Sequence, residues 1–203
     1  MAFKTLLRKV KRRLVQSGLL PFVQWLRIHK YKLFSTCIKV TGRPVRYQPL
    51  LMKGDGSIVF KDNVRIGVLS SPYFFSTYSY IEVRKPQSEI IFGNNVWINN
   101  NACFLSEGEG IKIGDGTLIG TNFCAFDSDF HELAIDKRMS GIPRTAAIVI
   151  GKNVFIGSNV TVLKGVSIGE NAVIANSSVV TKNIPANVIA GGNPCKVIRQ
   201  LNE

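Results

Sequence analysis

The chain has 203 residues, 45% of them hydrophobic, and a formal net charge of +13. This length and composition are typical of one folded domain with a short extension, and they exclude a disordered or fibrous chain. Residues 1–54 contain thirteen Lys or Arg and no acidic residue, whereas the rest of the chain is neutral. The basic N-terminal arm is therefore the region expected to meet an anionic partner.

Two helices are predicted in this arm. Apolar residues recur at steps of three and four over residues 3–14, with basic residues between them, which predicts an amphipathic basic helix. A second helix is predicted at residues 22–34, "FVQWLRIHKYKLF". Residues 1–34 either pack on the main domain or a neighbouring subunit, or lie on an anionic membrane surface, and the sequence leaves both open.

The arm contains no motif that reads a nucleic-acid groove, so no nucleic-acid partner is expected. No apolar run is long enough to span a bilayer, and no continuous apolar block indicates export. We therefore expect a cytoplasmic protein, peripheral at the inner membrane surface if the arm binds lipid. Four cysteines without a CxxC pair predict isolated buried thiols in a reducing compartment.

From residue 60 onward, aliphatic side chains recur every six positions. Toward the C-terminus a single phase continues without slippage, through Ile150, Ile156, Val162, Ile168, Ile174 and Val180. A six-residue period fits neither the 3.6-residue turn of an α-helix nor a plain strand alternation. It indicates an all-β solenoid in which each hexad forms one flat side and three sides close a coil.

The pattern predicts three regions: a basic helical arm at residues 1–54, a solenoid at 55–190 and a tail at 191–203. The hexads are interrupted at residues 126–149, and an insertion at a coil corner is where function is expected. An earlier interruption, "SSPYFFSTYSY" at residues 70–80, is rich in aromatic residues. It either stacks on a sugar face or caps the first coils, and the cap is the preferred interpretation.

The phased hexads, the single long loop and the ending "NIPANVIAGGNPCKVIRQL" together resemble the hexapeptide-repeat acyltransferases. The resemblance is strongest to the galactoside, maltose and polysaccharide O-acetyltransferases, and it covers residues 88–201. It implies a left-handed parallel β-helix, a homotrimer, acetyl-CoA as the acyl donor, a sugar or glycan acceptor, and no metal. The chain contains only two histidines, which excludes the three-histidine zinc site of a carbonic anhydrase on the same fold.

His131 lies in the interrupting loop and matches the catalytic histidine of the family. Acetyl transfer to a hydroxyl needs a proton acceptor, and imidazole titrates in the right range to remove that proton. The other histidine, His29, lies among basic residues of the arm and is interpreted as belonging to a solvated helix face. We therefore expect His131 to be the general base.

The resemblance also implies where the acceptor binds. Asn99 matches the asparagine that binds the acceptor sugar, with Asn101 as the alternative if the register shifts. Asp127 and Asp129 precede His131, and either could orient the imidazole or bind a sugar hydroxyl, or be an ordinary solvated carboxylate. Of these two, Asp129 is the predicted substrate-binding residue.

The donor site is implied at the outside of the C-terminal coils, in a groove between two subunits. The residues that match the coenzyme A contacts of the family are Ser158, Asn176, Thr181, Lys182, Lys196 and Arg199. The two last-named basic residues would face the nucleotide phosphates. Ser177 stands where the family has glycine, so a left-handed backbone there would be unfavourable for this chain.

The sequence thus predicts an acetyl-CoA-dependent O-acetyltransferase that acts on a sugar hydroxyl of a cell-surface polysaccharide or its precursor. The alternative is an N-acetyltransferase that acts on a nucleotide-activated amino sugar. A binding module without chemistry would not need the His131 loop. A nucleotidyltransferase would need a glycine-rich phosphate loop after its first strand, and the sequence contains none.

Overall fold

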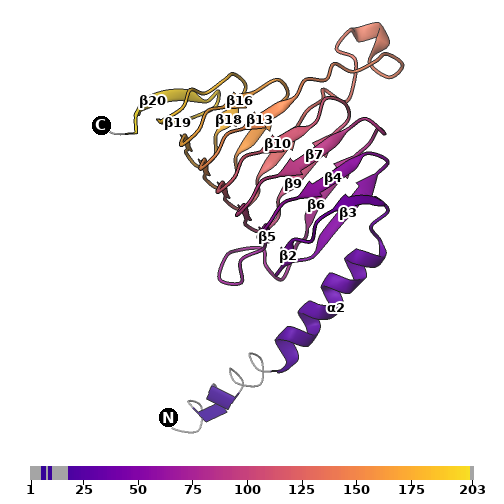
Figure 1. Ribbon diagram of the computed structural model, residues 1–203, viewed down its shortest axis with the longest axis vertical. Helices are drawn as coiled ribbons and strands as arrows, with labels where there is room; N and C mark the ends of the chain where they lie inside the picture. Colours follow the sequence, from indigo (N-terminus) through magenta and orange to yellow (C-terminus); the bar gives the residue numbers. More distant parts are fainter. Residues whose placement is uncertain (1–5, 8, 11–17, 202–203) are drawn as a thin grey trace.

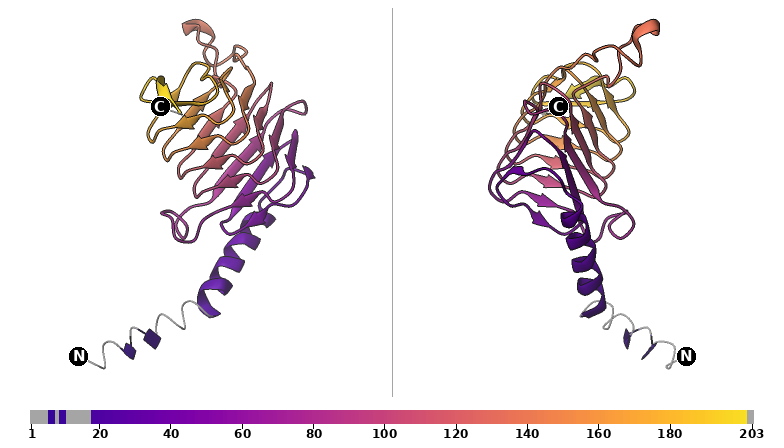
Figure 2. Two further views of the ribbon diagram at one scale, coloured as in Figure 1. Left: turned by 60° about the vertical axis from the view of Figure 1, so that its left-hand side comes forward. Right: turned by 90° about the vertical axis from the view of Figure 1, so that its right-hand side faces the viewer.

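The computed structural model describes residues 6–7, 9–10 and 18–201. The helix predicted at residues 3–14 lies mostly outside the described residues. The described chain forms a prism with three flat sides, each side a sheet (Figure 1). Figure 2 shows the prism along two further directions, with helix α2 (Leu20–Leu33) leaving its N-terminal end. The predicted parallel β-helix is confirmed.

The chain visits the three sheets in turn, one strand of each per coil. Sheet A consists of β1 (Lys39–Thr41), β4 (Ser57–Phe60), β7 (Glu89–Phe92), β10 (Ile111–Ile113), β13 (Ile148–Ile150) and β16 (Ser167–Ile168). Sheet B consists of β2 (Val45–Arg46), β5 (Arg65–Ile66), β8 (Trp97–Ile98), β11 (Leu118–Ile119), β14 (Phe155–Ile156), β17 (Val173–Ile174), β19 (Val188–Gly191) and β20 (Lys196–Gln200). Sheet C consists of β3 (Leu50–Gly54), β6 (Ser79–Val83), β9 (Cys103–Ser106), β12 (Cys124–Phe126), β15 (Thr161–Leu163) and β18 (Val179–Val180).

The predicted hexad residues form the core of this prism. Ile150 pairs with Ile168 and Ile156 pairs with Ile174, so one regular coil takes eighteen residues. Every hexad aliphatic from Ile150 to Val180 is at most 2% exposed. Burying such a side chain stabilises the fold by roughly 1.5–3 kcal/mol. The six-residue period is therefore the signature of one inward side chain per flat side.

The chain turns a corner wherever a strand of sheet B leads into the next strand of sheet C, and the row of these corners is here called the B–C edge. A ladder of hydrogen-bonded asparagines lies along this edge. Asn101 Nδ2 donates to Asn122 Oδ1, and Asn122 Nδ2 donates to Asn159 Oδ1, at 2.7 and 2.8 Å. All three adopt a left-handed backbone with φ between 57° and 63°. Ser177 takes the next position of the ladder with a φ of 60°. The expected unfavourable backbone at Ser177 is thus present.

Ser177→Asn is expected to raise the free energy of unfolding by about 0.5–1 kcal/mol, because asparagine tolerates positive φ and extends the ladder by one hydrogen bond. Urea unfolding followed by circular dichroism measures the change. The reverse substitution in the ladder, Asn159→Ser, should lower the stability by a similar amount. A destabilised Ser177→Asn variant would contradict the ladder as the source of corner stability.

The solenoid begins earlier than predicted. Residues 39–54 form β1, β2 and β3, which pair with β4, β5 and β6, so the boundary expected at residue 55 is wrong. Leu50 is fully buried in this first coil. The end also differs, because β20 returns antiparallel to β19 and belongs to sheet B rather than to a separate tail.

Helix α2 corresponds to the second predicted helix, and side-chain hydrogen bonds hold it to the first coils. Gln24 Nε2 donates to the carbonyl of Tyr47, and Arg27 donates to the carbonyls of Phe74 and Thr77. The opposite face is apolar and exposed, at Leu19, Phe22, Val23, Leu26 and Leu33. Within the described residues, no helix has the length and apolarity needed to cross a bilayer.

The aromatic insertion occupies residues 67–78, between β5 and β6. Asn100 is fully buried and donates to the carbonyls of Val68 and Pro72 at 2.8 Å, which fixes the start of the insertion. Phe74 is buried, as a cap requires, but Tyr73 and Phe75 are 43% and 52% exposed. The insertion therefore caps the first coils with one aromatic ring and exposes others.

Candidate functional site

The long loop between β12 and β13 spans residues 127–147 and stands out from the prism (Figure 1). It contains His131, the predicted general base, and is here called the catalytic loop after that prediction. It leaves from a corner between sheet C and sheet A, here called the C–A edge. Ser128 and Thr145 pair across its neck, and the amide of Asp129 donates to the carbonyl of Arg144 at 3.1 Å. These contacts bring the two ends of the insertion together, so its middle projects as a unit.

Asp127 anchors the base of the catalytic loop. Its carboxylate is fully buried and accepts hydrogen bonds from the Ser106 hydroxyl and from the amides of Glu107, Gly108 and Gly110. This carboxylate ties the catalytic loop to the preceding coil. Asp127 is thus a structural residue, and none of the three roles predicted for it describes it: imidazole partner, sugar-hydroxyl ligand or solvated carboxylate.

Asp127→Ala is expected to lower the free energy of unfolding on the order of 3–5 kcal/mol, because several buried donors lose their common acceptor. Asp127→Asn keeps one acceptor oxygen and should cost less than half as much. Chemical denaturation compares the two variants. An alanine variant as stable as the wild type would show that the carboxylate does not hold the catalytic loop.

The residue before His131 has an unusual backbone. Phe130 adopts φ 61°, a conformation that is rare for a bulky residue. Its ring packs edge-to-face on Phe126 at 5.7 Å between centroids, and the Arg84 guanidinium lies over it at 4.9 Å. Packing on both sides of the Phe130 ring holds this strained backbone in place. The turn directs the chain outward at His131.

His131 is exposed, and one ring nitrogen is already engaged. Its Nδ1 lies 3.1 Å from the carbonyl oxygen of Arg138, across the catalytic loop. A carbonyl can only accept, so in the neutral ring this contact requires hydrogen on Nδ1 and leaves a lone pair on Nε2. The catalytic loop therefore orients the imidazole with Nε2 as the available base.

Asp129 contacts a lysine of the next coil rather than the imidazole. Asp129 Oδ2 lies 3.3 Å from Lys164 Nζ, without the alignment of a hydrogen bond. Lys164 directly follows β15 at the same C–A edge. Lys164 could not be singled out in the sequence, because its position beside Asp129 arises only from the stacking of coils. The ion pair fixes the neck of the catalytic loop against the coil below.

Asn99 lies at the B–C edge, in a small hollow on the outside of sheet B. The hollow has a volume of about 190 Å³ and is lined by Val68, Trp97, Asn99, Leu118, Ile119, Gly120 and Phe155. Asn99 Nδ2 donates to the Ser71 hydroxyl at 3.1 Å. The aromatic rings of Trp97 and Phe155 are 41% and 52% exposed. These two rings were not predicted as site residues, although both occupy outward positions of their hexads.

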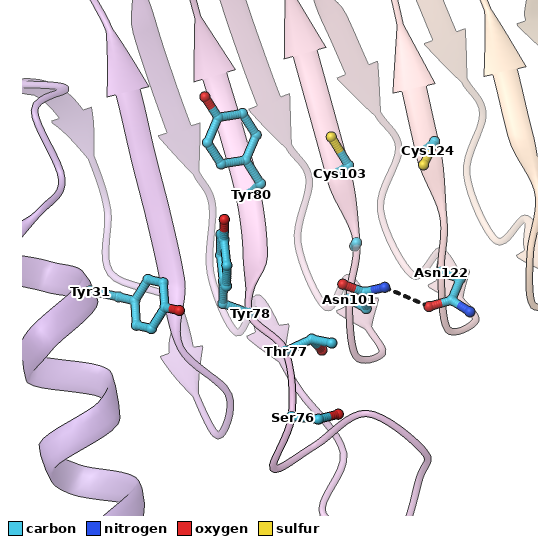
Figure 3. A pocket seen from close by; sticks show the side chains of 10 residues that line it. Tyr31, Ser76, Thr77, Tyr78, Tyr80, Asn101, Cys103, Asn122 and Cys124 are labelled. Carbon is cyan, nitrogen blue, oxygen red and sulfur yellow. Dashed lines mark hydrogen bonds between the residues drawn. The ribbon is translucent and has the colours of Figure 1, made fainter.

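Asn101, the alternative to Asn99, is instead a member of the corner ladder and borders a different hollow, on the outside of sheet C. Figure 3 shows this hollow, with a volume of about 360 Å³ and a wall of Tyr31, Tyr78 and Tyr80. Cys103 and Cys124 line it from adjacent strands in register. The expectation of isolated buried thiols is wrong for this pair, because the coil stacks residues that are far apart in sequence.

The two thiols influence each other. A hydrogen bond from Cys103 lowers the pKa of the Cys124 thiol to about 7, and the same contact together with burial raises the pKa of Cys103. Cys37 and Cys195 are buried, as predicted. Among the described residues, no group of three or more His, Cys, Asp or Glu side chains is arranged to hold a metal ion.

The predicted donor residues fall on different sides of the prism. Ser158 and Asn176 lie on the B–C edge, where Asn176 Oδ1 accepts from the Ser158 amide at 2.8 Å. Thr181 and Lys182 follow β18 on the C–A edge, and both are exposed. Lys196 and Arg199 are exposed on β20 of sheet B.

Two edges therefore carry the predicted site. The C–A edge presents His131, Asp129, Thr181 and Lys182, and the B–C edge presents Asn99, Ser158 and Asn176. A strand of sheet C runs between these edges, and five to six extended residues span about 15–20 Å. Within one protomer the imidazole and the Asn99 hollow are thus kept apart by the width of a sheet.

Comparison with known proteins gives matches in both sequence and structure. Residues 147–182 match the family model described as bacterial transferase hexapeptide (six repeats). Galactoside O-acetyltransferase of Escherichia coli strain K12 is 40% identical over 116 residues, which are 57% of this chain and 56% of that protein. The corresponding enzyme of Lactococcus lactis is 38% identical over 112 residues, covering 55% and 53%.

Among solved structures, a galactoside acetyltransferase in complex with coenzyme A superposes with a TM-score of 0.54 at 25% identity. The superposition covers 92% of this chain and 84% of that chain. The matched region spans a little over half the length of the curated relatives. The family-model match at residues 147–182 includes the coils from β13 to β18.

Proposed function

We propose that this chain, a hexapeptide-repeat protein of the acetyltransferase family, is an acetyl-CoA-dependent O-acetyltransferase that modifies a sugar hydroxyl of a cell-surface polysaccharide or its precursor. The observation that carries the proposal is the orientation of His131 by the Arg138 carbonyl, which leaves Nε2 with its lone pair. The similarity to enzymes named for acetyl transfer to galactosides supports the sugar acceptor.

The reaction follows from this imidazole. His131 Nε2 removes the proton of the acceptor hydroxyl as its oxygen attacks the thioester carbonyl. The tetrahedral intermediate then breaks its C–S bond, and the imidazolium returns the proton to the leaving thiolate. The products are the acetyl ester and coenzyme A thiol, so the base is regenerated. Such a base contributes typically about 10²–10⁴ in rate.

We further propose that each site is shared between two protomers of a homotrimer. The C–A edge of one protomer would face the B–C edge of the next, which brings His131 to the Asn99 hollow. Supporting this, four large apolar side chains of the catalytic loop are 59–88% exposed, namely Leu133, Ile135, Met139 and Ile142. Exposed apolar side chains at a projecting loop favour burial against another chain.

In this arrangement the Asn99 hollow holds the acceptor. Its amide can both donate to and accept from sugar hydroxyls, and the exposed rings of Trp97 and Phe155 offer apolar faces for the sugar ring. The pantetheine arm of acetyl-CoA would lie between Ser158 and Asn176 on one protomer and Thr181 and Lys182 on the other. Lys196 and Arg199 would bind the nucleotide phosphates.

The basic arm supports a peripheral position at the inner membrane surface. Residues 1–34 contain nine Lys or Arg and no acidic residue, and the free face of α2 is apolar. Anionic lipid is expected to bind such a surface in a salt-dependent way. Neutralising the six basic residues at positions 4–13 should weaken co-sedimentation with phosphatidylglycerol vesicles several-fold at low salt. Unchanged co-sedimentation would contradict the membrane contact.

Thiol release from acetyl-CoA, measured against a panel of glycans, nucleotide sugars and amino sugars, tests the proposed reaction. Mass spectrometry of the product then separates an ester from an amide by its sensitivity to mild base. An ester formed on a sugar hydroxyl is the expected outcome. Acetylation of amino groups alone would overturn O-acetyl transfer in favour of N-acetyl transfer.

A further inference from the structure

A charged residue occupies a core position of the first coil. Along sheet B the inward residue is aliphatic in successive coils, and Ile66, Ile98 and Ile119 stack in register. In the first coil the residue in register with Ile66 is Arg46. The inward positions of sheet B therefore end in an arginine at the N-terminal end of the β-helix, where no further coil stacks on β2.

Within the described residues, no anion pairs with this guanidinium. Arg46 as a whole is half-buried, but its Nη1 is buried and has no hydrogen-bond partner among residues 18–201, and no ion pair of the described chain includes Arg46. The first 54 residues contain no Asp or Glu, so the arm brings no carboxylate. Burial lowers the pKa of Arg46. An unpaired buried charge is unfavourable unless an anion joins it.

A pocket lies beside this charge. It has a volume of about 330 Å³, within the range of small-molecule sites, and its wall is mostly apolar. Helix α2 forms one wall with Leu20, Pro21, Gln24, Trp25 and Ile28, and Arg46, Tyr47, Leu69 and Phe74 complete the lining. Gln24 and Arg27 clamp α2 to the coil, so the pocket is held open by hydrogen bonds.

We propose that this pocket binds the phosphate head and the upper acyl chain of an anionic membrane lipid. The phosphate would pair with Arg46 as the missing anion, and the chain would lie along Ile28 and Trp25. Exposed apolar side chains lie along α2 from Leu19 to Leu33, on the same helix that forms one wall of the pocket. A ligand with an anionic end and an apolar chain matches this order of charge and apolar surface.

The proposal is independent of acetyl transfer, and its test measures binding alone. Isothermal titration of the full chain with dodecyl phosphate, below its micelle concentration, should give one site per protomer. Arg46→Gln should weaken binding about 10–100-fold, because a charge-assisted hydrogen bond of a buried pair is lost. The matched control Arg43→Gln removes the same charge from an exposed site in the same coil, and its affinity should stay within about twofold.

Two further titrations identify the source of the ligand. Dodecanol has the chain without the charge, and inorganic phosphate has the charge without the chain. Both should bind at least about 10-fold more weakly than dodecyl phosphate. If dodecanol bound as tightly as dodecyl phosphate, the pocket would be an apolar groove without a role for the charge. If inorganic phosphate bound as tightly, the ligand would be a soluble anion. Either result would overturn the lipid proposal.

The Arg46 variants need a check on folding. Arg46→Met places an apolar side chain in the interior ladder and should fold at least as well as the wild type, while losing binding to the same extent as Arg46→Gln. Trp25→Ala removes a half-exposed wall residue and should weaken dodecyl phosphate but leave inorganic phosphate unchanged. Wild-type affinity for dodecyl phosphate in a folded Arg46→Met variant would contradict the proposal. Dissociation of the native oligomer in the Arg46→Met variant would also contradict it, because Arg46 would then pair with a carboxylate of a partner subunit.

Discussion

His131→Ala is expected to reduce kcat for acetyl transfer by about 10²–10⁴ while the protein remains folded and binds coenzyme A. The side chain is exposed and contacts only the Arg138 carbonyl, so its removal leaves the core intact. Steady-state thiol release gives kcat, and calorimetric titration with coenzyme A gives the affinity. The loss should be confined to kcat.

The chain supplies its own control for this variant. His29 is the other histidine, and its Nδ1 contacts the Trp25 carbonyl at 2.8 Å on helix α2. The His29→Ala variant removes an imidazole in the same kind of contact, and its kcat should match that of the wild type. A His131→Ala variant that turns over as fast as His29→Ala would remove His131 from the reaction.

Mixed trimers of two inactive variants are expected to recover about a third of the wild-type activity. The C–A edge and the B–C edge lie on opposite sides of sheet C, so a site shared between protomers needs one intact edge from each of two chains. His131→Ala removes the base on the C–A edge. Ser158→Trp fills the groove on the B–C edge. In a trimer that contains both variants, about one of the three shared sites joins two intact edges.

Co-expression with two affinity tags isolates the mixed oligomers, and thiol release measures their activity against each parent. Both parents should be nearly inactive, and light scattering should give the same trimer mass for all three preparations. Mixed oligomers as inactive as their parents would place the whole site within one chain. That result would contradict the shared edges without contradicting the role of His131.

The regular coils could be predicted from the sequence because their period is a packing constraint. Ile150, Ile156 and Val162 recur every six positions since each flat side places one side chain inward, and no other regular structure has this spacing. The first coil could not be predicted from the sequence because it departs from this aliphatic period. Its interior position in sheet B is Arg46, which breaks the aliphatic phase that identifies a coil.

The candidate base His131 could be singled out from the sequence, but its surroundings could not. The interruption of the hexads and the scarcity of histidine single out His131 in the sequence. Its hydrogen bond to Arg138 depends on how the catalytic loop folds back, which no repeat pattern encodes. Likewise, Asp127 and Asp129 look equivalent in sequence, yet one is buried under three backbone amides and the other pairs with Lys164.

The sequence also could not predict which candidate site residues lie on the same edge of the prism. Asn99 and His131 are both near coil corners, and the linear sequence gives no reason to place those corners on different edges. The register of the stacked strands assigns Asn99 to the B–C edge and His131 to the C–A edge. The pairing of Cys103 with Cys124 has the same origin, since only the register makes them neighbours.

Chemical rescue of His131→Gly by added imidazole tests the general base most directly. The small residue leaves room beside the acceptor, and free imidazole can take the proton that Nε2 otherwise removes. We expect a very slow variant whose acetyl transfer rises in proportion to the concentration of neutral imidazole. A His131→Gly variant that transfers acetyl at the wild-type rate before any imidazole is added would contradict the role of His131 as general base.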